Sequence, residues 1–116
     1  MVPREQIASC LEAVRGRIRA AADRVERSVE DVRLVAVTKT VGIEEVQALR
    51  ELGVTDIGEN RLEVARPKVE AIGKAVRWHM VGPIQRRKAR DIVAMFDTVD
   101  AVDRIRAAEA LQRRCD

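Results

Sequence analysis

One short apolar stretch constrains the fold of this chain more than any other. Residues 34–37 are Leu, Val, Ala and Val, and no polar residue alternates with them. Two of the four are β-branched, and a charged residue precedes them. A continuous apolar run of this length is typical of a strand buried on both faces, as found in parallel sheets. We therefore expect a buried strand over residues 33–40 as part of a parallel sheet.

A lysine, Lys39, stands where this strand is expected to end, shortly before Gly42. Ligands of parallel α/β folds bind at the carboxyl ends of the strands. A partly desolvated lysine amine at such a place is uncharged part of the time and can form a Schiff base. A lysine that merely extends its amine into water fits the same residues. This stretch alone leaves both interpretations open.

The remaining chain alternates between helix and strand patterns. Apolar residues spaced three and four apart predict helices over residues 4–26, 43–52, 62–72, 84–96 and 105–111. Short apolar runs predict strands over residues 54–57, 76–81 and 98–102. Gly53 predicts the end of the helix over residues 43–52. Pro67 falls inside the next helix pattern and predicts a kink or a split there. One helix followed by four strand–helix units predicts an α/β fold with a parallel sheet.

Polar residues and glycines collect in the loops that follow the expected strands. Parallel strand–helix order brings these loops to one edge of the sheet. Simpler roles also fit: Gly58 can allow an unusual backbone angle, Asn60 can cap a helix, and His79 can be a hydrogen-bonded core residue. Convergence of the set on one rim leaves a shared site and these simpler roles both open. The whole set is Lys39, Thr40, Gly58, Glu59, Asn60, His79, Gly82, Asp100 and Asp103.

Length and charge exclude several classes of protein. The chain has 116 residues, 47% of them hydrophobic, which suits one small globular domain. Its 22 basic and 19 acidic residues are mixed and give a net charge of only +3, so we expect no nucleic-acid partner. Arginine-rich helix faces keep a nucleic-acid surface as a minor hypothesis, against which the interleaved acidic residues argue.

Cysteine and hydropathy patterns bear on the compartment. Cys10 and Cys115 are too few and too far apart for a disulfide framework, so we expect reduced thiols. With a single histidine, no spacing suits zinc. The sequence contains neither a run long enough to cross a bilayer nor a signal-peptide core, so we expect a cytoplasmic protein without a membrane partner.

Three segments together resemble one known family. They read Leu-Val-Ala-Val-Thr-Lys-Thr at 34–40, Asp-Ile-Gly-Glu-Asn at 56–60 and Trp-His-Met-Val-Gly-Pro-Ile-Gln at 78–85. Their order and spacing are similar to those of the pyridoxal-phosphate homeostasis proteins, the YggS/PROSC-type members of the alanine racemase-like (fold type III) superfamily. The resemblance extends over nearly the whole chain, from about Ile7 onward.

The resemblance implies a TIM-type (β/α)8 barrel and a function in intracellular pyridoxal 5′-phosphate (vitamin B6) homeostasis. It implies that Lys39 holds the cofactor as a Schiff base, with Asn60 and His79 close to it. Family members are regarded as cofactor carriers and regulators without a settled catalytic activity. The alternative is a fragment of a racemase- or decarboxylase-like enzyme, which needs a second acid/base group across from the lysine. The 116 residues of this sequence offer no obvious group for that role.

Two departures from the family pattern bear on these expectations. Arg87 stands where the family usually has an asparagine, so any contact of that asparagine is open at this position. A closed barrel needs eight strands and about 250 residues, whereas four strands are expected here. We therefore expect one partial barrel domain over residues 1–116, the N-terminal half, with the C-terminal half absent. The loops that hold the cofactor phosphate in the family belong to that half, so we expect weak cofactor retention and, from the two open sheet edges, self-association.

Overall fold

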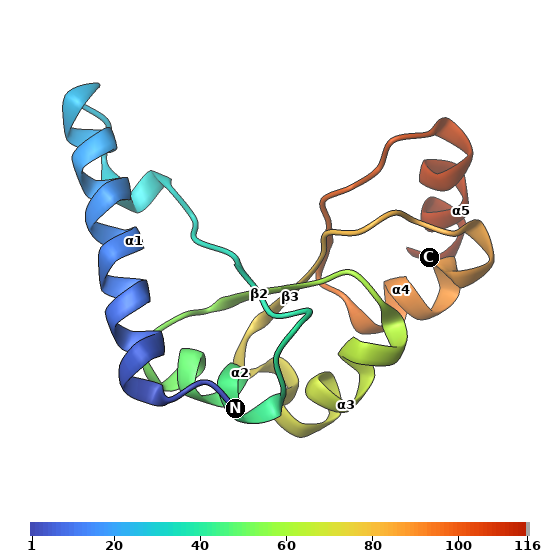
Figure 1. Cartoon of the computed structure of the whole chain (residues 1–116). Coiled ribbons are helices and arrows are strands. Elements are labelled where there is room, and N and C mark those ends of the chain that lie inside the picture. The colour runs from blue at the N-terminus through green and yellow to red at the C-terminus, as the bar shows by residue number, and fades with distance from the viewer. Residues whose placement is uncertain (116) are drawn as a thin grey trace.

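A computed structural model describes residues 1–115 of the chain, and Asp116 lies outside the described residues. Helices and strands alternate after a long first helix (Figure 1). In chain order the elements are α1 (Arg4–Arg24), the 3₁₀ turn η1 (Val29–Asp31), β1 (Ala36–Val37), α2 (Ile43–Glu51), β2 (Asp56–Glu59), α3 (Leu62–Ile72), η2 (Gly73–Ala75), β3 (Arg77–Met80), η3 (Arg86–Lys88), α4 (Ala89–Met95), β4 (Thr98–Val99) and α5 (Ile105–Cys115).

The four strands form one parallel sheet in the order β1-β2-β3-β4. The register places Val37 beside Gly58, Gly58 beside His79, and His79 beside Thr98. Strands that follow one another in the chain are therefore neighbours in the sheet, and each connection carries a helix. This is the arrangement of a barrel wall. The predicted α/β fold, with an N-terminal helix and four strand–helix units, is confirmed.

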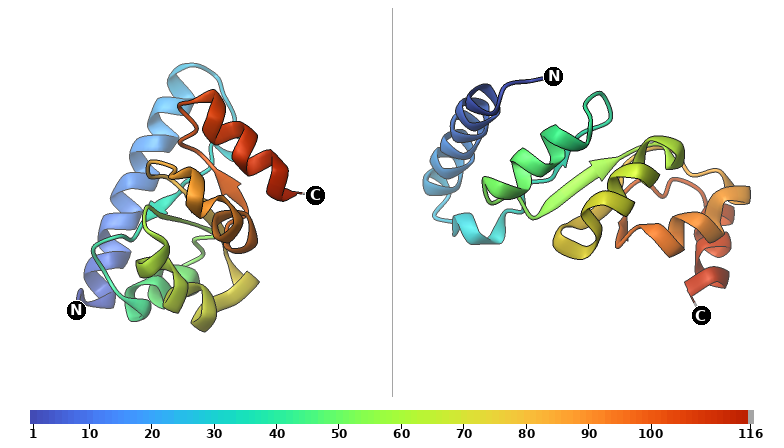
Figure 2. Two further views of the ribbon diagram at one scale, coloured as in Figure 1. Left: turned by 90° about the vertical axis from the view of Figure 1, so that its right-hand side faces the viewer. Right: turned by 90° about the horizontal axis from the view of Figure 1, so that it is seen from below.

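Helices cover one face of this sheet. Helices α2, α3 and α4 follow one another along that face, while α1 and α5 lie towards its two ends (Figure 1). α1 lies alongside α2 (Figure 2). On the helix-covered face, Ile57, Trp78 and Met80 of the two central strands are buried. Trp78 in addition donates its Nε1–H to the carbonyl oxygen of Gly73 at 2.8 Å. The centre of this core comprises Val46, Ile57, Leu62, Ala65, Trp78, Met80, Ile84 and Ile92.

The opposite face, which we call the inner face, carries no helix among residues 1–115 (Figure 1). Val37 on this face is 53% exposed. The radius of gyration of 15.6 Å exceeds the value of about 13 Å that is typical of a compact domain of this length. The prediction that the first strand is buried on both faces is therefore wrong. An open wall buries only the side that its own helices cover.

Two local expectations also need correction, and one is confirmed. β2 begins at Asp56, two residues later than predicted, so Glu59 lies in the strand and not in the loop. α3 runs unbroken from Leu62 to Ile72, so the split at Pro67 is wrong while the kink stays a prediction; the apolar residues of the helix pack on the core on both sides of the proline. Gly53 ends α2 as predicted, with a φ of 94° that favours glycine.

None of the described helices has the length and apolar character that a membrane crossing requires. Residues 1–115 also contain no cluster of three His, Cys, Asp or Glu side chains that could hold a metal ion.

Candidate functional site

The candidate site lies on the inner face, at the carboxyl ends of the strands. Successive side chains of a strand point to opposite faces, so residues two positions apart share a face. Backbone hydrogen bonds continue the pairing past the assigned strand ends, for example from Thr38 N to Gly58 O at 3.0 Å. The inner face thus has a middle row of Val37, Gly58, His79 and Thr98. The residues two positions further along each strand, which we call the rim row, are Lys39, Asn60, Val81 and Asp100.

Lys39 occupies the outer end of this rim row. It lies at the centre of a turn that closes when Val41 N donates to Thr38 O at 3.2 Å. The side chain is exposed, and it makes no hydrogen bond or ion pair with any other residue in the described part of the chain. Its amine is therefore free to react at the edge of the sheet where the carboxyl ends of the strands lie, as predicted.

Asn60 is the neighbour of Lys39 in the rim row, and it is half-buried. Gly82 presses against it, because a Cβ atom at Gly82 would lie 2.5 Å from the Asn60 Cβ and 2.9 Å from its Cα. Only glycine leaves room for this approach. The alternative role of Asn60 as a helix cap is wrong, since α3 begins after Arg61 and has no side-chain cap.

His79 is buried in the middle row, one row below Lys39 and two strands away. Its Nε2 donates to Asp56 Oδ1 at 2.8 Å. Its Nδ1 lies 2.9 Å from Asp100 Oδ2 and 2.7 Å from Thr98 Oγ1. Both ring nitrogens are thus engaged by the protein. His79 is a hydrogen-bonded histidine on the inner face, and no contact joins it to Lys39 in the described chain.

Asp56 anchors His79 from the neighbouring strand. Burial raises the pKa of Asp56, but the hydrogen bonds from His79 and Thr55 and the positive charge of Arg33 outweigh that effect. The net result is a pKa below the ordinary value of 3.8, so the carboxylate is ionised at neutral pH. Asp56 and Thr98 were missed by the sequence reasoning, although their positions in the strand patterns place them on the face of His79.

Other members of the predicted rim set lie elsewhere. Glu59 points to the helix-covered face and pairs with Lys68 at 2.7 Å, so its place on the rim was wrong. Asp103 is exposed and lies 3.6 Å from its neighbour Arg104. Arg87, the departure from the family pattern and not a member of this set, is also exposed, and its Nε donates to Gln85 Oε1 at 3.3 Å.

One surface ion pair lies near the rim, between α3 and η3. Lys88 Nζ donates to Glu63 Oε1 at 2.9 Å, and this hydrogen bond lowers the pKa of Glu63. The pair lies outside the inner face, because both residues belong to helical elements.

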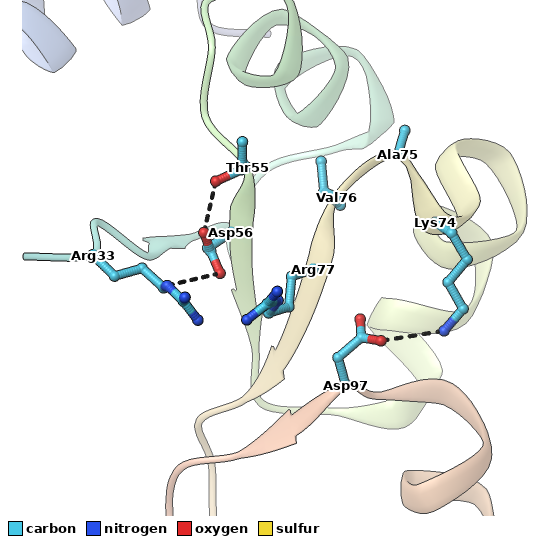
Figure 3. Close-up of a pocket in the computed structure, with 8 residues that line it drawn as sticks. All are labelled: Arg33, Thr55, Asp56, Lys74, Ala75, Val76, Arg77 and Asp97. Atoms are coloured by element: carbon cyan, nitrogen blue, oxygen red, sulfur yellow. Dashed lines mark hydrogen bonds and ion pairs between the residues drawn. The ribbon is translucent and has the colours of Figure 1, made fainter. Parts of the chain in front are cut away.

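A cavity of about 380 Å³ lies at the amino ends of the strands, the opposite edge from Lys39 (Figure 3). Its charged side chains are largely paired with one another: Lys74 lies 3.3 Å from Asp97, and Arg33 lies 3.8 Å from Asp56 (Figure 3). The cavity therefore belongs to the structural base of the sheet and not to the candidate site.

Sequence relatives share a single name. No family model matches the chain. The pyridoxal phosphate homeostasis protein of Pseudomonas aeruginosa is 38% identical over 109 residues, which cover 93% of this chain and 47% of the relative. That of Synechocystis is 40% identical over 84 residues, covering 71% of this chain and 38% of the relative. That of Escherichia coli is 34% identical over 109 residues, with coverages of 90% and 47%.

Solved structures agree with these relatives. An unknown protein from Bifidobacterium adolescentis matches with a TM-score of 0.89 and 30% identity over 98% of this chain and 52% of that chain. PipY of Synechococcus elongatus, solved with PLP bound, matches with a TM-score of 0.71 and 29% identity over 84% of this chain and 47% of that chain. The chain spans about half the length of the curated relatives it matches. These matches confirm the resemblance seen in the three sequence segments: the chain belongs to the pyridoxal phosphate homeostasis protein family.

Proposed function

We propose that this chain binds pyridoxal 5′-phosphate (PLP) at the rim of its inner face and acts in PLP homeostasis. Lys39 is the proposed attachment residue, with Asn60 and His79 lining the surroundings. The observation that carries the proposal is the amine of Lys39, which is exposed and unpaired in the described chain, at the carboxyl end of a strand in a parallel sheet. The relative PipY, whose structure has PLP bound, supports the choice of ligand.

The residues of the rim fit the aldehyde end of this cofactor. A free primary amine is the group that condenses with an aldehyde. One row below the rim, Gly58 has no side chain, and a Cβ atom there would lie 3.2 Å from Val35 Cγ1 and from Val81 Cγ1. The floor next to Lys39 is therefore flat and apolar. The phosphate end is the weaker part of the fit, because the rim row supplies no basic side chain besides Lys39. Weak retention of the cofactor is the expected result.

We further propose that the chain is a carrier rather than a catalyst. Bound PLP supplies an electron-withdrawing ring that stabilises carbanions, and an enzyme must add a second group that moves a proton. His79 is the natural candidate on the inner face, but Asp56, Thr98 and Asp100 already engage its two ring nitrogens. This engagement favours a role for His79 in holding the rim and disfavours the racemase- or decarboxylase-like alternative.

We also propose that residues 1–116 act as one partial barrel domain and that its open edges pair with a second copy. In the described chain β1 and β4 each have a partner strand on one side only. A second copy can present its β4 edge to β1 in parallel orientation, which continues the existing wall. The exposed Val37 would then gain cover, since it lies on the edge strand.

The test of cofactor binding is the visible absorption of PLP mixed with the full chain, followed by borohydride reduction and peptide mapping. The wild-type chain and the Lys74→Ala control, which loses an exposed lysine at the opposite edge, are expected to show a band and a label on Lys39. Lys39→Ala is expected to show neither. A band of equal strength in Lys39→Ala, with label spread over many lysines, would contradict the proposed site.

The carrier proposal has its own test on the same samples. The PLP-loaded chain is incubated with amino acids, and chiral chromatography and amine analysis follow the products. No enantiomer or decarboxylated amine is expected to form above the level of free PLP. Turnover that depends on Lys39 would favour the enzyme alternative instead.

A further inference from the structure

A buried polar cluster lies directly beneath the rim, on the helix-covered face. It consists of Thr38, Glu59 and Lys68, which we call the Lys68 cluster. Lys68 Nζ donates to the carbonyl oxygen of Thr38 at 2.6 Å and to Glu59 Oε2 at 2.7 Å. The hydroxyl of Thr38 donates to the same carboxylate oxygen. Thr38, Glu59 and Lys68 are only 1%, 0% and 3% exposed, so water contributes little to this arrangement.

Each strand member of the cluster immediately precedes a residue of the proposed site. Thr38 precedes Lys39, and Glu59 precedes Asn60. Because side chains alternate along a strand, the cluster points to the helices while Lys39 and Asn60 belong to the opposite face. The cluster and the site are therefore the two sides of the same short piece of backbone.

The carbonyl of Thr38 joins the cluster to the turn that presents Lys39. This oxygen accepts from Lys68 Nζ at 2.6 Å and from Val41 N at 3.2 Å. The second bond closes the turn whose two central residues are Lys39 and Thr40. Lys68 thus fixes, from within the core, the orientation of the peptide group from which Lys39 extends.

Core packing alone does not account for this cluster. A buried ion pair is weak evidence for stability, since apolar residues of similar volume are often at least as favourable. Moreover, Glu59 Oε1 is buried without a hydrogen-bond partner in the described chain, which is unfavourable. β1 is the edge strand, and its assigned pairing ends at Val37. The backbone that carries Lys39 therefore needs a further support, which the cluster provides.

We propose that Lys68 and Glu59 are positioning residues that hold the Thr38–Val41 turn and so direct the amine of Lys39 over the inner face. The inference rests on the proposed function, because it takes Lys39 as the attachment residue. It assigns two different tasks to two lysines of one sequence. Lys39 reacts, and Lys68, which is buried and donates to Thr38 and Glu59, holds the backbone beneath it.

The experiment compares the full wild-type chain with Lys68→Met/Glu59→Gln, which removes both charges at similar volume. The matched control is Lys88→Met/Glu63→Gln, which removes the surface lysine–glutamate pair that joins η3 to the same helix α3. Two quantities are measured: the hydrogen-exchange rate of the Val41 amide, without cofactor, and the PLP concentration that half-saturates labelling of Lys39. In the cluster variant we expect Val41 to exchange about tenfold faster, as for the loss of one hydrogen bond. We expect the half-saturating concentration to rise by about tenfold or more, with neither change in the control.

The outcomes separate this inference from the proposed function. Unchanged Val41 exchange and unchanged labelling in a folded cluster variant would overturn the positioning role. No labelling of Lys39 in the wild-type chain would overturn the proposed function, while the exchange rate of Val41 would still decide whether the cluster holds the turn. Should the double variant lose its folded circular-dichroism spectrum, Lys68→Met alone, which removes the bond to the Thr38 carbonyl, provides the same two readouts with the same expected directions.

Discussion

The two faces of the sheet are made by the same four strands, yet they differ in burial and in chemistry. On the helix-covered face, Ile57 and Trp78 are fully buried in an apolar core. On the inner face, Val37 is more than half exposed, and His79 of the middle row bonds to Thr98 and Asp56. One face therefore supplies stability, and the other supplies reactive groups on a surface that is still accessible.

The difference also shows where polar groups are tolerated. Asp56 and His79 lie on the open face, where partners come from neighbouring strands. Glu59 and Lys68 are the exception, because they form a charged pair inside the apolar face. They border the backbone that leads into Lys39 and Asn60, through Thr38 and Glu59.

The largest expected effect is the difference in the free energy of unfolding between substitutions on the two faces. Trp78→Ala removes a fully buried ring and should lower the free energy of unfolding by about 3–5 kcal/mol. Val37→Ala on the inner face should change it by no more than about 0.5 kcal/mol. Urea denaturation of both variants measures the difference. Equal losses would mean that the inner face is covered in solution.

A smaller effect is expected where the backbone of the rim is tightest. Gly82→Ala places a Cβ atom 2.5 Å from Asn60 Cβ, so the loop must shift. We expect a loss of about 1–3 kcal/mol in the free energy of unfolding together with weaker PLP labelling of Lys39.

The matched control for the rim is Gly16→Ala in α1, where a Cβ atom would meet nothing within 4 Å. Removing a helical glycine should stabilise the chain by about 0.5–1 kcal/mol and leave labelling unchanged. If Gly82→Ala is as harmless as this control, Gly82 does not hold Asn60 in place.

The pH dependence of stability tests the polar row of the inner face. The folded-state pKa of Asp56 lies below its ordinary value of 3.8, so its ionised form stabilises the fold. This contribution is complete well above pH 3.8 and is lost as the pH falls through the lower folded pKa. The stability difference between wild type and Asp56→Asn should therefore shrink between about pH 5 and about pH 3.

Urea denaturation at a series of pH values measures this difference. Asp23→Asn on the exposed surface of α1 is the control, and its stability should run parallel to that of the wild type. A difference between wild type and Asp56→Asn that stays constant down to about pH 3 would show that Asp56 is not held ionised by its partners.

The smallest expected effect on the single chain concerns the open edge. Val37→Lys places a charge on an edge strand, which should change the free energy of unfolding by no more than about 0.5 kcal/mol. It should nevertheless weaken pairing with a second copy, since lysines on edge strands oppose edge-to-edge association. Sedimentation velocity at several micromolar concentrations compares the two chains. A wild-type chain that remains monomeric throughout would contradict the proposed self-association.

Local patterns were sufficient to predict most of the fold. The spacing of apolar residues placed the start of α2 at Ile43, and Gly53 marked its end, because both signals act within a few residues. The order of strands followed from their regular alternation with helices. The exposure of Val37 could not be predicted in this way. An apolar strand residue looks the same in the sequence whether or not another part of the protein covers it.

The site was predicted in part. Lys39 and Asn60 fall where strand ends should meet, and each follows by two positions a residue of the register pair Val37 and Gly58. Glu59 was misplaced because β2 starts and ends two residues later than predicted, so Glu59 is a strand residue whose side chain meets Lys68. Lys68 gave no signal, since it occupies an ordinary helix position and its partners are 9 and 30 residues away in sequence. The roles of Lys39, Asn60 and His79 in cofactor binding stay predictions.

The buried indole of Trp78 has an optical consequence. The chain has one tryptophan and no tyrosine, so its near-ultraviolet emission comes almost entirely from a single ring. That ring belongs to β3, two strand spacings or about 10 Å from the strand of Lys39. A pyridoxyl chromophore on Lys39 would quench this emission by energy transfer. Unfolding of the core would instead shift the wavelength of maximal emission of Trp78. The fluorescence of Trp78 can thus report cofactor binding and the folded state of the chain as two separate signals in one sample.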